Sequence, residues 1–141
     1  MEFRYLTPNY AVSPQITPED VPAVKAAGFV SVICNRPDAE IPEPIQAVHL
    51  RAAVEAAGMV FVDNPLIPGA LTPENIATQA RVQAEARGPV FAYCASGNRS
   101  SIAWALSQAG KLPTDELIAR PAQWGYDLEP FRARLADLAQ R

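Results

Sequence analysis

Residues 89–101 have the sequence Pro-Val-Phe-Ala-Tyr-Cys-Ala-Ser-Gly-Asn-Arg-Ser-Ser. This segment combines a strand pattern, a loop that begins with a cysteine, and the start of a helix. The apolar run Pro89–Tyr93 predicts a buried parallel strand, because such strands are covered on both faces. A helix is expected to begin near Arg99 and to end at Gly110. In parallel sheets the functional loops lie at the carboxyl ends of the strands, so Cys94 is predicted at that edge.

The loop between this strand and this helix combines features that suit an anion and a sulfur nucleophile. Gly97 allows the backbone to turn its N–H groups inward, and successive inward N–H groups form a nest for an anion. The helix adds its positive N-terminal end, and Arg99 can bind two oxygens of an oxyanion at once. The same surroundings stabilise a thiolate, to which Ser100 could donate a hydrogen bond. We therefore interpret Cys94 as a nucleophile, Arg99 and Ser100 as its catalytic partners, and the loop residues between them as the substrate-binding nest: Ala95, Ser96, Gly97 and Asn98.

The remaining sequence alternates strand and helix patterns. Two short strands are predicted within residues 3–12, and later strands at 29–34 and 59–62. Helices are predicted at 17–28, 44–57 and 72–88, the last with an apolar stripe of Ile76, Ala80 and Ala84. After residue 110 only helical patterns follow, at 114–122 and 128–139. This order predicts a single α/β domain over residues 1–141, with a mostly parallel central sheet flanked by helices.

Composition narrows the classes of function. The 141 residues are 49% hydrophobic and 19% charged, with a formal net charge of -3 and no basic cluster. Nucleic acid is therefore not an expected partner. No apolar run approaches the ~18 residues of a membrane span, and the N-terminus lacks a signal-peptide pattern, so we expect a cytoplasmic protein without a membrane partner. Two cysteines and one histidine do not form a metal-binding pattern, and we expect no metal and no cofactor.

Other polar residues border the predicted site or lie outside it. Arg36 and Asp38 follow the strand at 29–34, in a loop expected at the same sheet edge as Cys94. They either form a solvated turn stiffened by Pro37 or support and contact the substrate. His49 is expected to have a packing or surface role in the middle of a helix. Tyr126 is expected in a corner between two helices, with a place in the pocket wall as the alternative.

Five segments of the chain resemble a known bacterial family. They are VSPQITPED (12–20), VICNRPDAE (32–40), PLIPGALTPE (65–74), GPVFAYCASGNRSS (88–101) and GYDL (125–128). In combination they resemble the phosphatase-like and sulfurtransferase domain family of beta-lactamase-hydrolase-like proteins, over nearly the whole chain. The loop itself resembles that of cysteine-based protein-tyrosine and dual-specificity phosphatases, shortened by one residue, and the six-residue loop of rhodanese sulfurtransferases.

The resemblance implies a fold of the cysteine-phosphatase type, with three C-terminal helices after the catalytic loop. A rhodanese fold would need a further strand there. In the phosphatases that the chain resembles, an acidic residue that protonates the leaving group follows the strand before the catalytic one. That position falls near Pro68, where no carboxylate stands; Asp63 comes too early and Asp38 lies on another loop.

Sulfur transfer needs no such acid, because sulfite leaves thiosulfate as a stable anion. We therefore expect a cysteine-dependent sulfurtransferase, which passes sulfane sulfur from a small-molecule donor, thiosulfate or a persulfide, to a thiol acceptor through a Cys94 persulfide. A phosphatase that works through a phosphocysteine is one alternative. A non-catalytic module that binds oxyanions or phosphoproteins is the other.

Cys34 ends the strand predicted at 29–34. Neighbouring parallel strands lie roughly 5 Å apart, within the Cα range of a disulfide, so Cys34 is a candidate redox partner of Cys94. Some phosphatases that the loop resembles carry a cysteine at the matching strand end, where it protects the catalytic cysteine from over-oxidation. The alternative is that Cys34 only fills a core site.

Overall fold

Apolar runs and turn residues divide the chain into five short strands and six α-helices. The computed structural model describes all 141 residues. The strands are β1 (Arg4–Thr7), β2 (Tyr10–Ser13), β3 (Ser31–Cys34), β4 (Val60–Asp63) and β5 (Val90–Tyr93). The helices are α1 (Val21–Ala26), α2 (Ala47–Ala56), α3 (Pro73–Glu85), α4 (Asn98–Ser107), α5 (Thr114–Ala122) and α6 (Arg132–Ala139). Short 3-10 turns at Pro18–Asp20, Asp38–Glu40, Glu43–Ile45 and Glu129–Phe131 complete them.

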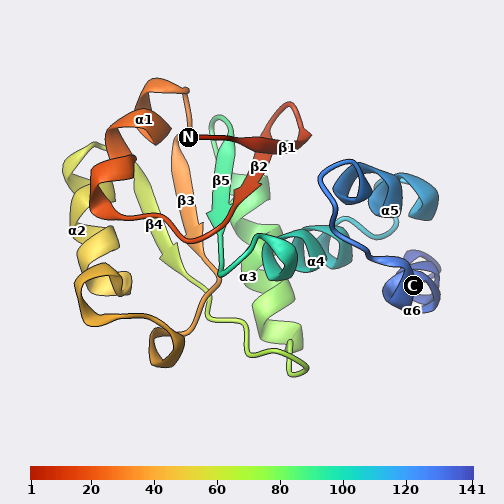
Figure 1. Ribbon diagram of the computed structural model, residues 1–141. Coiled ribbons are helices and arrows are strands. Elements are labelled where there is room, and N and C mark those ends of the chain that lie inside the picture. The colour runs from red at the N-terminus through yellow and green to blue at the C-terminus, as the bar shows by residue number, and fades with distance from the viewer.

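The sheet has the strand order β1-β2-β5-β3-β4 and is parallel except for β1, which pairs antiparallel with β2. Helices α1 and α2 cover one face of the sheet, α3 and α4 cover the other, and α5 and α6 pack beyond α4 (Figure 1). This arrangement confirms the predicted α/β fold. The chain ends in helices after the Cys94 loop, as the resemblance to cysteine phosphatases implied.

Side-chain alternation along the strands divides the interior into two cores. Ile33 and Ala92 face the core under α3 and α4, which also contains Trp104 and Leu117. Their neighbours along the strands, such as Cys34, face the core under α1 and α2. Helix α4 is buried along nearly its whole length, and its Trp104 side chain is fully buried.

Some predicted boundaries and faces differ from those observed. Helix α2 begins at Ala47 rather than near Pro44, because Pro44 lies in a separate 3-10 turn. Helix α3 buries Gln79 and Val82, whereas Ala84 of the predicted stripe is exposed. Gln79 replaces an apolar residue on that face because its amide donates to the buried Tyr10 hydroxyl at 3.1 Å.

The end of α3 and the start of α6 also differ from the prediction. Helix α3 stops at Glu85 because Ala86 is already extended, and the last helical region contains a 3-10 turn before α6 begins at Arg132. No helix has both the length and the apolar character that crossing a membrane would require.

Candidate active site

Strand β5 places Cys94 at the centre of the carboxyl edge of the sheet. It lies between β2 and β3, and all four of its residues are buried. Cys94 follows directly and is 1% exposed, and its N–H donates to the carbonyl of Ser13 at 3.4 Å. The sheet therefore fixes the backbone of Cys94, and the turn that follows determines which groups surround the sulfur atom.

The turn after Cys94 depends on Gly97. This residue has φ 100°, in the left-handed region that side chains disfavour, and its N–H donates to the Cys94 sulfur at 3.0 Å. A Cβ atom at this position would lie 2.2 Å from the Tyr126 hydroxyl oxygen. Both the backbone conformation and the close contact therefore require glycine, as the sequence predicted for the conformation.

Four backbone N–H groups in and just after the Cys94 loop have no acceptor within the chain, and only the first two belong to residues of the predicted nest. These are the backbone N–H groups of Ala95, Ser96, Arg99 and Ser100, the last two in the first turn of α4. Asn98 differs, because its N–H donates to the Ser96 hydroxyl at 3.2 Å. Free donors at the start of a ten-residue helix attract an anion through both hydrogen bonding and the helix dipole.

Arg99 lies beside the nest in an ion pair that the sequence did not reveal. Its Nη2 and Nη1 atoms donate to the two carboxylate oxygens of Glu40, at 2.7 and 2.9 Å. Nη1 also donates to the carbonyl of Leu66 at 2.8 Å. The Glu40 carboxylate raises the pKa of Arg99, burial opposes this shift, and the nearby Cys94 sulfur adds to it.

Ser100 is held by a chain of buried amides. Its hydroxyl accepts from Asn35 at 2.9 Å, Asn35 accepts from Asn64 at 3.4 Å, and Asn64 accepts from Asn75 at 2.8 Å. Asn35 and Asn64 directly follow β3 and β4, so a polar residue after each strand was the available signal. With Asn35 donating to the hydroxyl, the Ser100 proton is free for another acceptor, and donation to the Cys94 thiolate stays a prediction.

Arg36 and Asp38 form hydrogen bonds with residues outside the Cys94 loop rather than with the loop itself. Arg36 donates to the Glu40 carbonyl at 2.9 Å and to the Gln15 side chain at 3.3 Å. The Asp38 carboxylate accepts from the N–H of Ala47 at 2.9 Å, at the start of α2. Asp38 is therefore fixed to the start of α2 rather than free in a solvated turn, and its contact with the substrate stays a prediction.

Asp63 and Asp38, which the sequence analysis set aside as leaving-group acids, lie away from the Cys94 loop. Partial burial raises the pKa of Asp63, and the neighbouring Asp38 raises it further, whereas Arg51 of α2 lowers it. Asp63 also lies opposite Cys34 in the sheet register, on the α2 side. Neither aspartate contacts the Cys94 loop, and the carboxylate that does reach it is Glu40.

Cys34 does not face Cys94. Its partner in the register with β5 is Tyr93, one residue before Cys94, and both side chains belong to the core under α1 and α2. The Cys34 sulfur donates to the Arg36 carbonyl at 3.4 Å, and burial raises the pKa of the thiol to about 11, an effect that the Tyr93 hydroxyl partly offsets. Both cysteines are free. The register therefore differs by one residue from the alignment expected of a redox pair, and the pairing of Cys34 with Cys94 stays a prediction.

Tyr126 contacts the Cys94 loop. Its hydroxyl donates to the Ser96 carbonyl at 2.7 Å and accepts from Arg4 at 2.7 Å. Tyr126 therefore lies in the predicted corner, between α5 and the last helical region, and also contacts the Cys94 loop. His49 pairs with Glu43 on the exposed side of α2 at 2.9 Å, which confirms a surface role.

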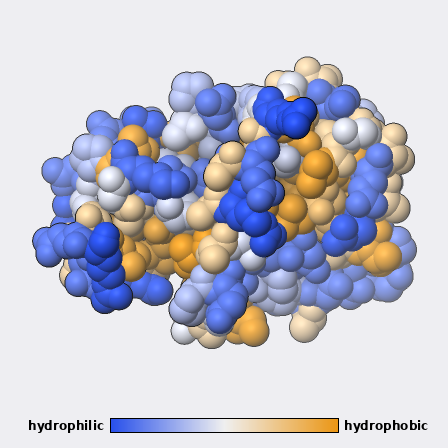
Figure 2. Space-filling model, turned by 180° about the vertical axis from the view of Figure 1, so that it is seen from behind, coloured by the Kyte–Doolittle hydropathy of each residue, from blue (hydrophilic) through white to orange (hydrophobic).

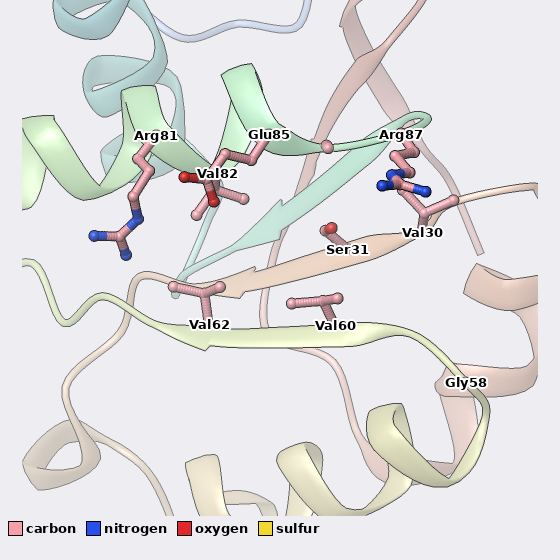
Figure 3. Close-up of a pocket in the computed structure, with 10 residues that line it drawn as sticks. Val30, Ser31, Gly58, Val60, Val62, Arg81, Val82, Glu85 and Arg87 are labelled. Carbon is pink, nitrogen blue, oxygen red and sulfur yellow. The ribbon is translucent and has the colours of Figure 1, made fainter.

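A groove elsewhere on the molecule contains no reactive group. It has a volume of about 430 Å³ and lies between α3 and the edge strand β4. Val60 and Val62 line its floor, with Arg81 and Glu85 reaching over it from α3 (Figure 3). On the reverse side of the molecule, apolar surface is exposed only in patches between hydrophilic side chains (Figure 2). This groove therefore offers no nucleophile comparable to Cys94.

Relatives and solved structures agree with this geometry. A beta-lactamase hydrolase-like protein of Agrobacterium fabrum is 33% identical over 111 residues, which are 77% of this chain. Relatives of the same description from Xylella fastidiosa are 31% identical over 120 residues. The chain spans about a quarter of the length of these proteins, 26% to 28%.

Among solved structures, a phosphatase candidate from Neisseria meningitidis Z2491 is 31% identical, with a TM-score of 0.83 over 98% of this chain and 99% of that one. Tk-PTP in its active form, at 17% identity, has a TM-score of 0.76 over 99% of this chain and 97% of that one, and shows the same fold. The model of the phosphatase-like domain of beta-lactamase hydrolase-like proteins matches residues 2–111. The chain, with its phosphatase-like fold and its cysteine loop, belongs to this family.

Proposed function

We propose that this chain is a cysteine-dependent phosphatase that hydrolyses phosphate monoesters through a phosphocysteine at Cys94. The observation that carries the proposal is the set of free N–H donors in the loop that follows Cys94 and in the first turn of α4, together with the Gly97 N–H on the sulfur and the Arg99 guanidinium beside it. Such a set binds the nonbridging oxygens of a phosphate and stabilises the charge that builds up during transfer. The phosphatase-like family and the Neisseria structure support this choice over the sulfurtransferase expected from the sequence.

The reaction would proceed in two displacements. The Cys94 thiolate attacks phosphorus, the S–P bond forms, and the P–O bond to the leaving group breaks with its electron pair on that oxygen. Water then attacks the phosphocysteine, releases inorganic phosphate and restores the thiolate. Throughout both steps, Arg99 and the N–H groups of Ala95 and Ser96 would hold the nonbridging oxygens.

The surroundings of the loop favour a particular class of leaving group. No carboxylate lies near Pro68, and Arg99 holds the pKa of Glu40 below its usual range, so Glu40 is ionised at neutral pH. Neither position then offers a proton to a departing alkoxide. We therefore expect aryl phosphates, whose phenolates leave more readily, to be better substrates than alkyl phosphates.

One experiment tests the phosphatase directly. Hydrolysis of an aryl phosphate should be measurable with the unmodified protein, and mass spectrometry of rapidly quenched protein should find a phosphoryl group on Cys94. Cys34→Ser provides the matched cysteine control and should keep both signals. Absence of hydrolysis, with no phosphorylated cysteine, would reject the proposal.

A second candidate is sulfur transfer, which two features favour: only four residues separate Cys94 from Arg99, and no carboxylate follows β4 near Pro68. The Cys94 thiolate would attack the sulfane sulfur of thiosulfate, and the S–S bond to sulfite would break with its electrons on sulfite. A small thiol would then remove the outer sulfur as its own persulfide and release the Cys94 thiolate.

The two enzymes are separated by the mass added to Cys94. Thiosulfate treatment should add one sulfur atom to a sulfurtransferase, whereas aryl phosphate should add a phosphoryl group to a phosphatase. A non-catalytic binding module would show neither adduct, and it would retain phosphate binding after Cys94→Ser without any turnover in the unmodified protein.

A further inference from the structure

The guanidinium of Arg99 has five N–H donors, and the structure uses three of them. Nη1 donates both of its hydrogens, to Glu40 and to the Leu66 carbonyl. Nη2 donates one hydrogen to the other Glu40 oxygen. The donors that remain are the Nε–H and the second Nη2–H, which lie on one edge of the planar group. This edge presents two parallel donors, the geometry that matches two oxygens of a phosphate or sulfate.

Glu40 therefore binds Arg99 without occupying the edge that suits an anion. The carboxylate takes the end of the guanidinium, between Nη1 and Nη2, and the Leu66 carbonyl takes the opposite side of Nη1. Rotation of the group would break these three bonds. The Arg99 side chain is only 13% exposed, so water has limited access to replace them.

Glu40 is in turn held by residues that lead back to the Cys94 loop. Arg36 contacts a Glu40 carboxylate oxygen at 3.4 Å and donates to the Glu40 carbonyl at 2.9 Å. Arg36 also donates to the Gln15 side chain at 3.3 Å, and the Gln15 N–H donates to the carbonyl of Ala95 at 3.3 Å. These contacts form a continuous chain from the loop and back to it: Arg99, Glu40, Arg36, Gln15 and Ala95.

We propose that Glu40 is the positioning residue of Arg99, and that it fixes the guanidinium so that its Nε–Nη2 edge faces an oxyanion at the Cys94 sulfur. The proposal rests on the proposed function, because it takes the Cys94 loop to be the anion site. Glu40 does not touch the substrate in this account, and Arg36 acts one step further away by holding Glu40.

The opposite role would be that Glu40 competes with the substrate for Arg99, and the two roles predict effects of opposite sign. Replacing Glu40 by glutamine removes a negative charge near the site, which by itself favours binding of an anion. If Glu40 competes, Glu40→Gln should bind oxyanions more tightly. If Glu40 positions Arg99, the variant should bind them more weakly despite the favourable change in charge.

The test measures binding rather than turnover. Phosphate and sulfate would be titrated into Cys94→Ser protein while the backbone amide signals of Ala95 and Gly97 are followed by NMR. Glu40→Gln in this background should weaken both anions about tenfold or more. Glu43→Gln is the matched control, because Glu43 is an exposed glutamate of the same region whose side chain pairs only with His49. Equal or tighter binding by Glu40→Gln would overturn the proposal.

Two further measurements exclude a general structural effect. The loss caused by Glu40→Gln should disappear when Arg99 is also changed to Lys, since lysine has no planar edge to position. The 15N relaxation of the Arg99 Nε group should show a rigid side chain that becomes mobile in Glu40→Gln but not in Glu43→Gln. An equally rigid Arg99 in both variants would reject the positioning role. If the protein with intact Glu40 binds neither anion, the anion site of the proposed function fails, and Arg99 mobility still tests Glu40 separately.

Discussion

The ends of β3 and β5 carry the two cysteines of the chain, one residue apart in register, and their surroundings differ completely. Cys34 is the last residue of β3, opposite Tyr93, and its thiol lies in an apolar core with a raised pKa. Cys94 is the first residue after β5, and its sulfur accepts the N–H of Gly97. One step along a strand reverses the face of the sheet, so the residue type alone does not determine a cysteine's role.

The largest expected effect separates the two cysteines by activity. Cys94→Ser should lower the hydrolysis of an aryl phosphate by at least about 1000-fold, because the serine hydroxyl is a far weaker nucleophile than a thiolate at neutral pH. Cys34→Ser should stay within about threefold of the unmodified protein, since Cys34 faces the other core. Comparable losses in both variants would remove the distinction between the two strand ends.

A smaller loss should follow from the guanidinium beside Cys94. Arg99→Lys is expected to reduce kcat/KM by about 100-fold, because lysine keeps the charge but cannot present two parallel donors. Arg36→Lys, in the loop after β3, should cost about tenfold or less, since Arg36 acts through Glu40. Steady-state kinetics with one aryl phosphate measures both variants. An Arg36→Lys loss as large as that of Arg99→Lys would place Arg36 in direct contact with the substrate.

The turn that distinguishes Cys94 from Cys34 can be tested through stability. Gly97→Ala should lower the free energy of unfolding by about 2 kcal/mol or more, because a left-handed backbone and a close contact with Tyr126 are imposed together. Gly125→Ala is the matched control: its φ is 88°, and a Cβ there would meet nothing within 4 Å. It should cost only about 1 kcal/mol of backbone strain. Denaturant unfolding measures the difference, and equal losses would show that the Tyr126 contact is unimportant.

The smallest expected effect concerns the buried thiol and appears only at alkaline pH. The pKa of Cys34 rises from its ordinary value of 9.0 to about 11 on folding, so above pH 9 the unfolded thiol ionises while the folded one does not. Stability from this group is therefore fully present below pH 9 and is lost as the pH rises toward 11. Cys34→Ala should remove up to about 2 kcal/mol of the alkaline loss. Parallel pH-stability curves for the variant and the unmodified protein would contradict the burial of an un-ionised thiol.

Much of the fold could be predicted because its signals are local. The apolar run before Cys94, the turn glycines and the helix starts at Thr17 and Thr72 each act within a few residues. The predictions failed where a distant contact overrides a local pattern. The burial of Gln79 depends on the hydroxyl of Tyr10, 69 residues away in the sequence, and no periodicity within α3 reveals it.

The residues of the site likewise divide into those that the sequence could identify and those that it could not. Cys94, Gly97 and Arg99 could be identified because the loop concentrates its chemistry in six consecutive residues. Glu40 could not be identified, because it lies 59 positions from Arg99 in the sequence. Only the pairing of β3 with β5 in the sheet brings the two side chains together. The stretch after β4, near Pro68, has no carboxylate, and the one that contacts Arg99 comes from the loop after β3.

The sequence by itself determined the α/β class, the cysteine loop with Cys94 as the candidate nucleophile, and the turn at Gly97, since all of these follow from short-range backbone and side-chain chemistry. The tertiary structure alone decided which groups surround that turn. It paired Glu40 with Arg99, connected Ser100 to the buried asparagines, and turned Cys34 toward the other core. The physical reason is register: strands from distant parts of the chain must align before their carboxyl ends, and the loops that follow them, acquire neighbours.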